Sequence, residues 1–280
     1  MTETVLITGC SSGIGRETAE SFLADGWEVY ATARNPADIE ALGEQGCNIA
    51  TLDVTDDGDV ERVVDRIIDE EGRIDCLVNN AGYGQLGPIE DVPVESVEKQ
   101  FDVNVFGPHR LTRAVLPHMR QRQTGTIVNV SSVAGRVSTP GMGVYCGSKA
   151  AMESMSDALR PEVDRFGIDV VLVEPGPVET AFAERAESEA NGFERSDAYD
   201  DIYSILDDAG TLGSGAPGEI SPVEVAETIL DAANLTDPAA RYPVGKIAEA
   251  STFARFVPAT IMDKLYGFGF SLLSKRSSSD

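Results

Sequence analysis

The sequence predicts an α/β fold in which one parallel, seven-stranded sheet lies between two layers of helices. Two observations predict it. Short apolar or β-branched runs alternate with helical patterns along most of the 280 residues, and these runs are mainly apolar rather than alternating between apolar and polar residues, as in strands that are buried on both faces. Right-handed crossovers then favour a doubly wound, Rossmann-type sheet. No repeat or low-complexity segment marks a boundary, so residues 1–280 are expected to form a single domain.

The elements follow one another in a regular order. The expected strands are residues 4–8, 28–32, 48–54, 75–80, 125–130, 169–175 and 241–245. The expected helices are residues 13–24, 37–44, 57–70, 96–122, 144–165 and 222–233. Each strand up to the sixth is followed by a helix or a long connection, which is the βα alternation of a parallel sheet.

Two segments depart from this alternation. Residues 183–219 are acidic and end in GTLGSGAPGE, which predicts a mobile insertion. The insertion leaves the carboxyl end of a strand, where ligands bind in open sheets, so it is expected to form a substrate lid. The tail, about residues 251–273, is apolar and aromatic but too interrupted by charges and proline to span a bilayer.

The composition excludes several classes of protein. The chain has 47 acidic and 22 basic residues and a formal net charge of -25, so no nucleic-acid partner is expected. It has no apolar run of about 18 residues and no basic, apolar leader, which favours a cytoplasmic location without a transmembrane segment. Its four cysteines lack metal-ligand spacing, which predicts reduced thiols and no metal site. With only five lysines, the composition is similar to that of proteins from salt-accumulating halophiles. Homo-oligomerisation stays open.

A glycine-rich turn follows the first expected strand. In LITGCSSGIGRETA, Gly9, Gly13 and Gly15 have the spacing G-x-x-x-G-x-G at the start of a helix. Glycines let a backbone approach a pyrophosphate, and a helix N-terminus favours negative charge. Glycine-rich turns without a ligand are common, but the position after the first strand of an alternating chain favours dinucleotide binding.

Tyr145 and Lys149 lie four residues apart in the helix expected over residues 144–165. Their side chains therefore share one helix face. An ammonium beside a phenol lowers the phenol's pKa from about 10, which would make Tyr145 a proton donor or acceptor. A chance pair on a surface helix is the simpler interpretation of these two residues by themselves.

Several separately placed motifs make the chain resemble the classical short-chain dehydrogenase/reductase family over about residues 4–180, and it is similar to the steroid and retinol dehydrogenase branch. The motifs are TGCSSGIG at residues 8–15, DVTD at 53–56, NNAG at 79–82 and PGPVET at 175–180. The cofactor-binding residues that this resemblance implies are Gly9, Ser11, Ser12, Gly13, Ile14, Gly15, Arg34, Asp53, Val54, Asn80, Ala81, Gly82, Tyr145, Lys149, Pro175, Gly176, Val178 and Thr180. Asp53 and Val54 would meet the adenine, and the Val178 backbone and the Thr180 hydroxyl would meet the nicotinamide carboxamide.

The resemblance also implies a catalytic tetrad of Asn104, Ser132, Tyr145 and Lys149. Hydride transfer to a ketone develops negative charge on its oxygen, so the site needs a proton donor and a hydrogen-bond donor there. Tyr145 and Ser132 would supply them, Lys149 would bind the nicotinamide ribose, and Asn104 would position a water. The alternatives are a strand-end cap for Ser132 and, for Asn104, a helix kink or a satisfied backbone contact.

The end of the second strand bears on the cofactor. Ala33 stands where NAD-using relatives carry an aspartate, and Arg34 follows it. A basic residue accommodates a ribose 2′-phosphate, so NADP is favoured over NAD. Against this, Ser12 is neutral where many NADP-using relatives have a basic residue.

The predicted function is therefore hydride transfer between NADP(H) and a carbonyl compound or secondary alcohol, with an apolar small-molecule substrate and Tyr145 as proton donor or acceptor. The alternative is a redox-inactive dinucleotide sensor or scaffold on the same fold. Such proteins characteristically lose the tyrosine or the lysine, and this chain keeps both. An extended-type nucleotide-sugar epimerase is disfavoured by the glycine spacing and the chain length.

Overall fold

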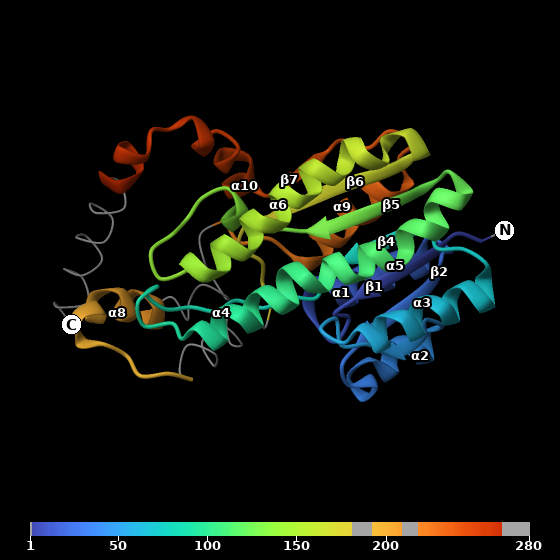
Figure 1. Ribbon diagram of the computed structural model, residues 1–280, viewed down its shortest axis with the longest axis horizontal. Helices are drawn as coiled ribbons and strands as arrows, with labels where there is room; N and C mark the ends of the chain where they lie inside the picture. Colours follow the sequence, from blue (N-terminus) through green and yellow to red (C-terminus); the bar gives the residue numbers. More distant parts are fainter. Residues whose placement is uncertain (1, 181–191, 209–217, 265–280) are drawn as a thin grey trace.

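The computed structural model describes residues 2–180, 192–208 and 218–264. Its centre is a seven-stranded parallel sheet in the order β3-β2-β1-β4-β5-β6-β7 (Figure 1). The strands are β1 Thr4–Thr8, β2 Glu28–Ala33, β3 Asn48–Thr51, β4 Cys76–Asn79, β5 Gly125–Val130, β6 Ile168–Pro175 and β7 Arg241–Val244. The predicted fold class, a doubly wound parallel sheet, is confirmed.

The helices cover both faces of this sheet. The α-helices among the described residues are α1 Gly13–Ala24, α2 Glu40–Gln45, α3 Asp57–Glu71, α4 Val94–Phe101, α5 Gly107–Arg122, α6 Gly143–Val163, α8 Asp200–Asp208, α9 Pro222–Asn234 and α10 Lys246–Ser251. One apolar core joins α1, α2 and α9 to one face, and a second joins α3, α5 and α6 to the other. The sheet is therefore buried on both sides, as the apolar strands predict.

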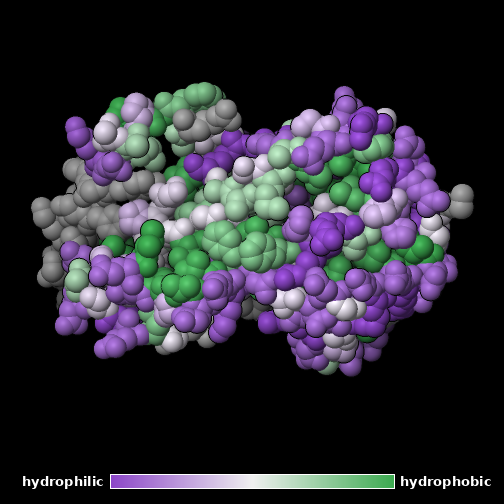
Figure 2. All heavy atoms as spheres, in the orientation of Figure 1, coloured by the Kyte–Doolittle hydropathy of each residue, from purple (hydrophilic) through white to green (hydrophobic). Residues whose placement is uncertain are grey.

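Helix α3 illustrates how the sequence forms these layers. Val60, Val63, Val64 and Ile67 recur at helical spacing and are buried against the sheet. The helix begins where the Asp56 side chain accepts from the Asp59 N–H, at 2.8 Å. Its outer face is acidic, and Figure 2 shows hydrophilic residues over the region of α2 and α3.

The helix expected over residues 96–122 is not uniform. A π-helical turn, Asp102–Phe106, separates α4 from α5. A continuous α-helix would need an N–H of residue 108 to reach the carbonyl of Asn104, and Pro108 has none. The break therefore places Asn104 in a special backbone turn.

The expected lid is partly helical. Residues 192–208 contain a short 3-10 turn, Asp197–Tyr199, and helix α8. Figure 1 shows α8 at the end of the molecule toward which the arrow of β5 points, which is the side where the strands end. The rest of the expected lid up to residue 217, and the tail from residue 265, lie outside the described residues.

In the described part of the chain, no helix is long and apolar enough to cross a membrane. The four cysteines are all buried and unbridged.

Candidate active site

The glycine-rich turn lies at the switch point of the sheet, where the chain order reverses between β1 and β4. The Asn80 side chain, just after β4, donates to the carbonyls of Thr8 at 2.9 Å and Gly9 at 3.2 Å. The Thr8 hydroxyl in turn accepts from the N–H groups of Asn80 and Ala81, each at 3.0 Å. The motifs around residues 8–15 and 79–82 thus hold each other in place.

The glycine positions of this turn have no room for a side chain. A Cβ at Gly15 would lie 2.3 Å from the Gly9 carbonyl oxygen and 2.4 Å from the Asn80 amide nitrogen. Gly9 has a φ of 74°, which favours glycine. Ser12 precedes α1 in an extended conformation, and its side chain makes no capping hydrogen bond. A bare backbone at an uncapped helix N-terminus fits the pyrophosphate of a dinucleotide.

The segment after β6 reaches the same turn. Residue Val178 forms an isolated parallel bridge with Ile220, whose N–H and C=O bond to Pro177 and Glu179 at 3.0 and 3.1 Å. In a parallel bridge of this kind the N–H of Val178 points away from Ile220. A Cβ at Gly13 would lie 2.9 Å from the Thr180 side chain. The segment expected to hold the pyrophosphate and the segment expected to hold the nicotinamide are therefore neighbours.

The residues expected around the adenine lie at the ends of β2 and β3. Arg34 is exposed and Ala33 is buried. The Asp53 carboxylate accepts from the Thr55 N–H at 2.9 Å and hydroxyl at 2.7 Å. This turn ends β3 at Thr51, before the expected end at residue 54. Its hydrogen bonds explain the presence of an aspartate at residue 53 even without a bound ligand. The adenine contacts of Asp53 and Val54 stay predictions.

Tyr145 and Ser132 meet at the end of β5. Tyr145 lies in the first turn of α6 and is 6% exposed. Ser132 begins the 3-10 turn Val133–Gly135, where its hydroxyl oxygen accepts from the Ala134 N–H at 3.1 Å. The side chains of Ser132 and Tyr145 also share a hydrogen bond. Ser132 therefore both caps the turn and touches the tyrosine.

Lys149 lies beside this pair in a buried position. Its Nζ donates to the Val130 carbonyl at 2.7 Å and lies 6.0 Å from the centroid of the Tyr145 ring. Burial lowers the pKa of Lys149 to about 8, although the charge of Glu153 opposes this. A lysine with this pKa is mostly charged at neutral pH and loses its proton in the mildly alkaline range.

The expected lowering of the Tyr145 pKa is wrong for this structure. Burial raises the pKa of Tyr145 to about 12, and the hydrogen bond from Ser132 lowers it only in part. The loss of water around the phenol is the larger effect, and the spacing of Tyr145 and Lys149 in the sequence does not reveal it.

Asn104 is fully buried, and its side-chain amide is hydrogen-bonded to other groups of the protein. Its amide nitrogen donates to the Tyr83 carbonyl at 3.0 Å and to the Ser148 hydroxyl at 3.1 Å, and its oxygen accepts from the Tyr83 N–H at 3.2 Å. Ser148 donates to the carbonyl of Tyr145 at 2.7 Å. Both alternatives for Asn104, a helix break and satisfied backbone contacts, are therefore present. That it positions a water stays a prediction.

The sequence analysis missed the apolar wall beside the tyrosine. Met142 packs against the buried cluster that contains Tyr145 and Cys146, and both Met142 and Leu206 pack against Leu86. Leu206 belongs to α8, so Leu86 and Met142 together connect this helix to the cluster that holds Tyr145. The only sequence signal was a methionine three residues before Tyr145, which a plain core position would also explain.

Asp91 fixes α8 over this wall. Its carboxylate accepts from the Tyr203 hydroxyl at 2.6 Å and from the Ser196 N–H at 3.0 Å. Tyr203 is only 4% exposed, so its ring offers little surface to a substrate. Its hydroxyl instead holds the segment in place.

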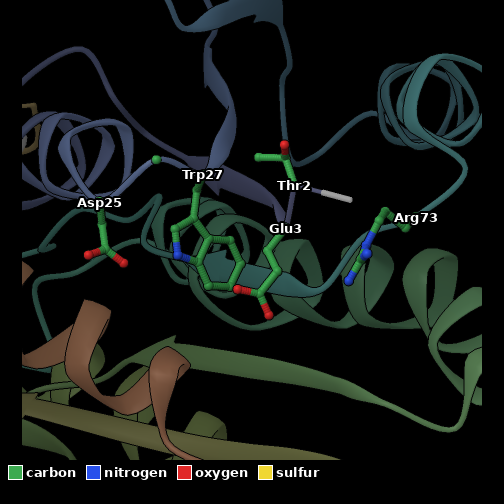
Figure 3. A pocket seen from close by; sticks show the side chains of 6 residues that line it. Thr2, Glu3, Asp25, Trp27 and Arg73 are labelled. Carbon is green, nitrogen blue, oxygen red and sulfur yellow. The ribbon is translucent and has the colours of Figure 1, made fainter.

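A separate hollow lies at the opposite edge of the sheet. Figure 3 shows it lined by the side chains of Thr2, Glu3, Asp25, Trp27 and Arg73. These residues precede β1, β2 and β4, so the hollow lies at the amino ends of the strands and away from Tyr145.

Comparison with known proteins agrees with this geometry. A family model described as short chain dehydrogenase matches residues 3–191. An NADPH-dependent 3-dehydrocapnine reductase of Ornithobacterium rhinotracheale is 34% identical over 97% of this chain and 99% of the relative. Estradiol 17-beta-dehydrogenase 1 of Rattus norvegicus is 38% identical over 85% and 72% of the two chains. Retinol dehydrogenase 8 of Bos taurus is 44% identical over 64% and 60%.

Solved structures agree as well. A short-chain dehydrogenase from Streptomyces avermitilis has a TM-score of 0.81 and 32% identity over 99% of this chain and 98% of its own. A Burkholderia phymatum short chain dehydrogenase/reductase in complex with NAD has a TM-score of 0.72 and 27% identity over 82% and 85%. The closed form of a serine dehydrogenase complexed with NADP+ has a TM-score of 0.76 and 29% identity over 87% and 95%. The chain belongs to the short-chain dehydrogenase family, within which it is similar to the steroid and retinol dehydrogenases, and it is an NAD(P)-dependent dehydrogenase/reductase.

Proposed function

We propose that this enzyme interconverts an apolar carbonyl compound and its secondary alcohol with NADP(H), using Tyr145 as the proton donor or acceptor. One observation carries the proposal. The Tyr145 hydroxyl is hydrogen-bonded to Ser132 at the carboxyl end of the sheet, next to a buried lysine and an apolar wall. A carbonyl oxygen placed between the two hydroxyls would meet one proton donor and one hydrogen-bond donor.

The side chains would divide the work as follows. Ser132 stabilises the negative charge that develops on the substrate oxygen. Tyr145 transfers its proton to that oxygen, and its pKa of about 12 keeps the hydroxyl protonated at neutral pH. Lys149 stabilises the phenolate left behind, since a cation beside a phenolate favours the charged form. A bound nicotinamide cofactor supplies the hydride.

Asn104 holds this arrangement together. Through Tyr83 and Ser148 it joins the segment after β4 to the first turns of α6. Because Ser148 also bonds the Tyr145 carbonyl, the position of the tyrosine depends on Asn104.

The preference for NADP rests on the end of β2. An exposed Arg34 beside an uncharged Ala33 favours a 2′-phosphate over a bare hydroxyl. The relative that reduces 3-dehydrocapnine is named as NADPH-dependent, and the structural neighbours hold either NAD or NADP. Arg34 is therefore the residue on which the choice depends.

The preference for apolar substrates rests on Met142, Leu86 and Leu206. These side chains form an apolar wall beside the cluster that holds Tyr145, and the hydroxyls of Tyr145 and Ser132 would then be the polar groups that fix the substrate's orientation. Relatives named for estradiol and retinol are consistent with this class.

A substrate panel tests the function. Aldehydes and ketones of graded size are assayed with NADPH and NADH in high salt, and cofactor binding is measured in parallel by fluorescence. The proposal expects turnover that is faster with NADPH and highest for apolar ketones. Tight cofactor binding without turnover of any carbonyl or alcohol would instead support the redox-inactive sensor.

A further inference from the structure

A cluster of charged side chains is buried behind the catalytic helix. Arg241 of β7 bonds Glu153 of α6 at 3.0 Å and Glu174 of β6 at 3.1 Å. Arg136 also bonds Glu174, at 2.7 Å. The side chains of Glu153 and Glu174 are only 9% and 1% exposed. Two carboxylates therefore share one guanidinium in a place that water hardly reaches.

Glu153 lies one helical turn after Lys149, on the same face of α6. A Cβ at Gly135 would lie 2.9 Å from the Glu153 Cγ, 3.0 Å from the Ser131 hydroxyl oxygen and 3.3 Å from the Lys149 carbonyl oxygen. Glu153 is thus packed directly under the turn that carries Ser132. The cluster lies against both halves of the proposed site.

Lys149 needs an anion in this setting. Its side chain is buried, and its Nζ donates a hydrogen bond to the neutral carbonyl of Val130 at 2.7 Å. A buried ammonium without a counter-charge loses its proton. Glu153 is the carboxylate whose charge raises the pKa of Lys149 against the effect of burial.

The other charged groups around the lysine do not replace Glu153. Tyr145 of α6 is neutral at physiological pH, since its pKa is raised to about 12. Glu174 is held between Arg136 and Arg241, so its charge is compensated twice. Arg241 and Arg136 are cations and oppose a charged lysine.

We propose that Glu153 is a positioning residue for Lys149: its carboxylate, fixed by Arg241 from β7, keeps the buried lysine charged and so sets the upper limit of the pH range in which the enzyme turns over. This inference rests on the proposed function, which makes the charged lysine the partner of Tyr145. It also gives β7, far from Tyr145 in the sequence, a part in the chemistry.

The sign of the effect follows from the charges. Replacing Glu153 by Gln removes the negative charge that favours protonated Lys149, so the lysine loses its proton at a lower pH. The alkaline limb of the pH profile should therefore move down, by about one pH unit.

Asp157 supplies a matched control. It bonds the same Arg241 nitrogen at 2.7 Å, but its side chain is 47% exposed and lies two helical turns from Lys149. Asp157→Asn therefore weakens the Arg241 cluster without removing the charge next to the lysine. Glu153→Asp keeps the charge and should restore the wild-type profile if Glu153→Gln changes it.

Two measurements test the proposal. Because the chain has five lysines, labelling their Cε carbons with ¹³C lets the Lys149 signal be followed by NMR, with Lys149→Arg to identify it. Its pKa should fall by about one unit in Glu153→Gln and stay unchanged in Asp157→Asn and Glu153→Asp. The pH profile of kcat/KM, measured on the NADPH-saturated enzyme with a ketone from the substrate panel, should shift in the same variant only.

The outcomes separate the two hypotheses. Equal Lys149 titrations in wild type and Glu153→Gln overturn the role of Glu153, whatever the activity. A shifted NMR titration with an unshifted rate profile overturns the link to turnover. If Glu153→Gln lowers the melting temperature but moves neither profile, the cluster is only structural. If no carbonyl is turned over by the wild type, the proposed function fails and the NMR titration still decides whether Glu153 charges Lys149.

Discussion

Tyr199 and Tyr203, just before and in α8, make a controlled pair. Tyr203 donates to Asp91 and Tyr199 donates to Glu90, so each hydroxyl bonds a carboxylate of the same loop. The two hydrogen bonds differ in their exposure to solvent. Tyr203 is only 4% exposed, whereas the bond of Tyr199 to Glu90 is exposed. Replacing each by Phe removes one hydroxyl and leaves the ring.

The expected magnitudes differ with the exposure. A hydrogen bond to a charged group in a part-buried position contributes about 1.5 to 3 kcal/mol, so Tyr203→Phe should favour opening of α8 by about 2 kcal/mol. That corresponds to about a 30-fold larger open population. Tyr199→Phe should change it by less than about threefold, because water replaces the lost partner.

Amide hydrogen exchange over residues 196–208 measures the opening directly. Exchange there should accelerate about 30-fold in Tyr203→Phe and little in Tyr199→Phe. The Michaelis constant for bulky apolar ketones should rise in Tyr203→Phe more than that for small ones. Equal exchange in the two variants would refute the idea that Asp91 and Tyr203 hold α8 over the site.

Three further predictions concern the cofactor, the glycine turn and the charge. Ala33→Asp with Arg34→Ser should shift the ratio of NADP to NAD affinities toward NAD by tenfold or more, measured by titration, because a carboxylate repels a 2′-phosphate; an unchanged ratio would contradict the role of Arg34. Gly15→Ala should weaken NADPH binding at least tenfold and lower the melting temperature, since its Cβ would lie 2.3 Å from the Gly9 carbonyl oxygen; Gly43→Ala, whose Cβ meets Ile49 at an ordinary 3.4 Å, should do neither. Because the chain has a net charge of -25, its melting temperature should rise between dilute buffer and molar KCl, as the screening length falls from about 10 to about 3 Å. A melting temperature that does not rise with salt would contradict the interpretation of the composition as halophilic.

The sequence predicted the sheet because each strand carries its own evidence. A run such as residues 4–8 is apolar on both faces, and that pattern needs no knowledge of distant residues. The glycine turn was predictable for the same reason. A tight strand-to-helix turn requires glycine locally, and the contact of Gly15 with Gly9 lies within the motif.

The finer features of the site depend on distant partners. Nothing near Tyr203 in the sequence shows that its hydroxyl will bond Asp91, 112 residues away. The rise in the Tyr145 pKa comes from burial by neighbours that the helix pattern does not reveal. The π-helical turn at Asn104 did have a local signal, because Pro108 cannot donate to the carbonyl four residues before it.

Replacing Tyr145 by Phe tests the central claim most directly. The variant keeps the aromatic ring and loses only the hydroxyl that would carry the proton. In the presence of NADPH, kcat/KM for every carbonyl substrate should fall by about 10² to 10⁴, while the dissociation constant for NADPH stays within about twofold. Tyr199→Phe, which removes an exposed hydroxyl, should keep normal turnover of small ketones. Near wild-type turnover in Tyr145→Phe, with NADPH bound, would contradict the assignment of Tyr145 as the proton donor.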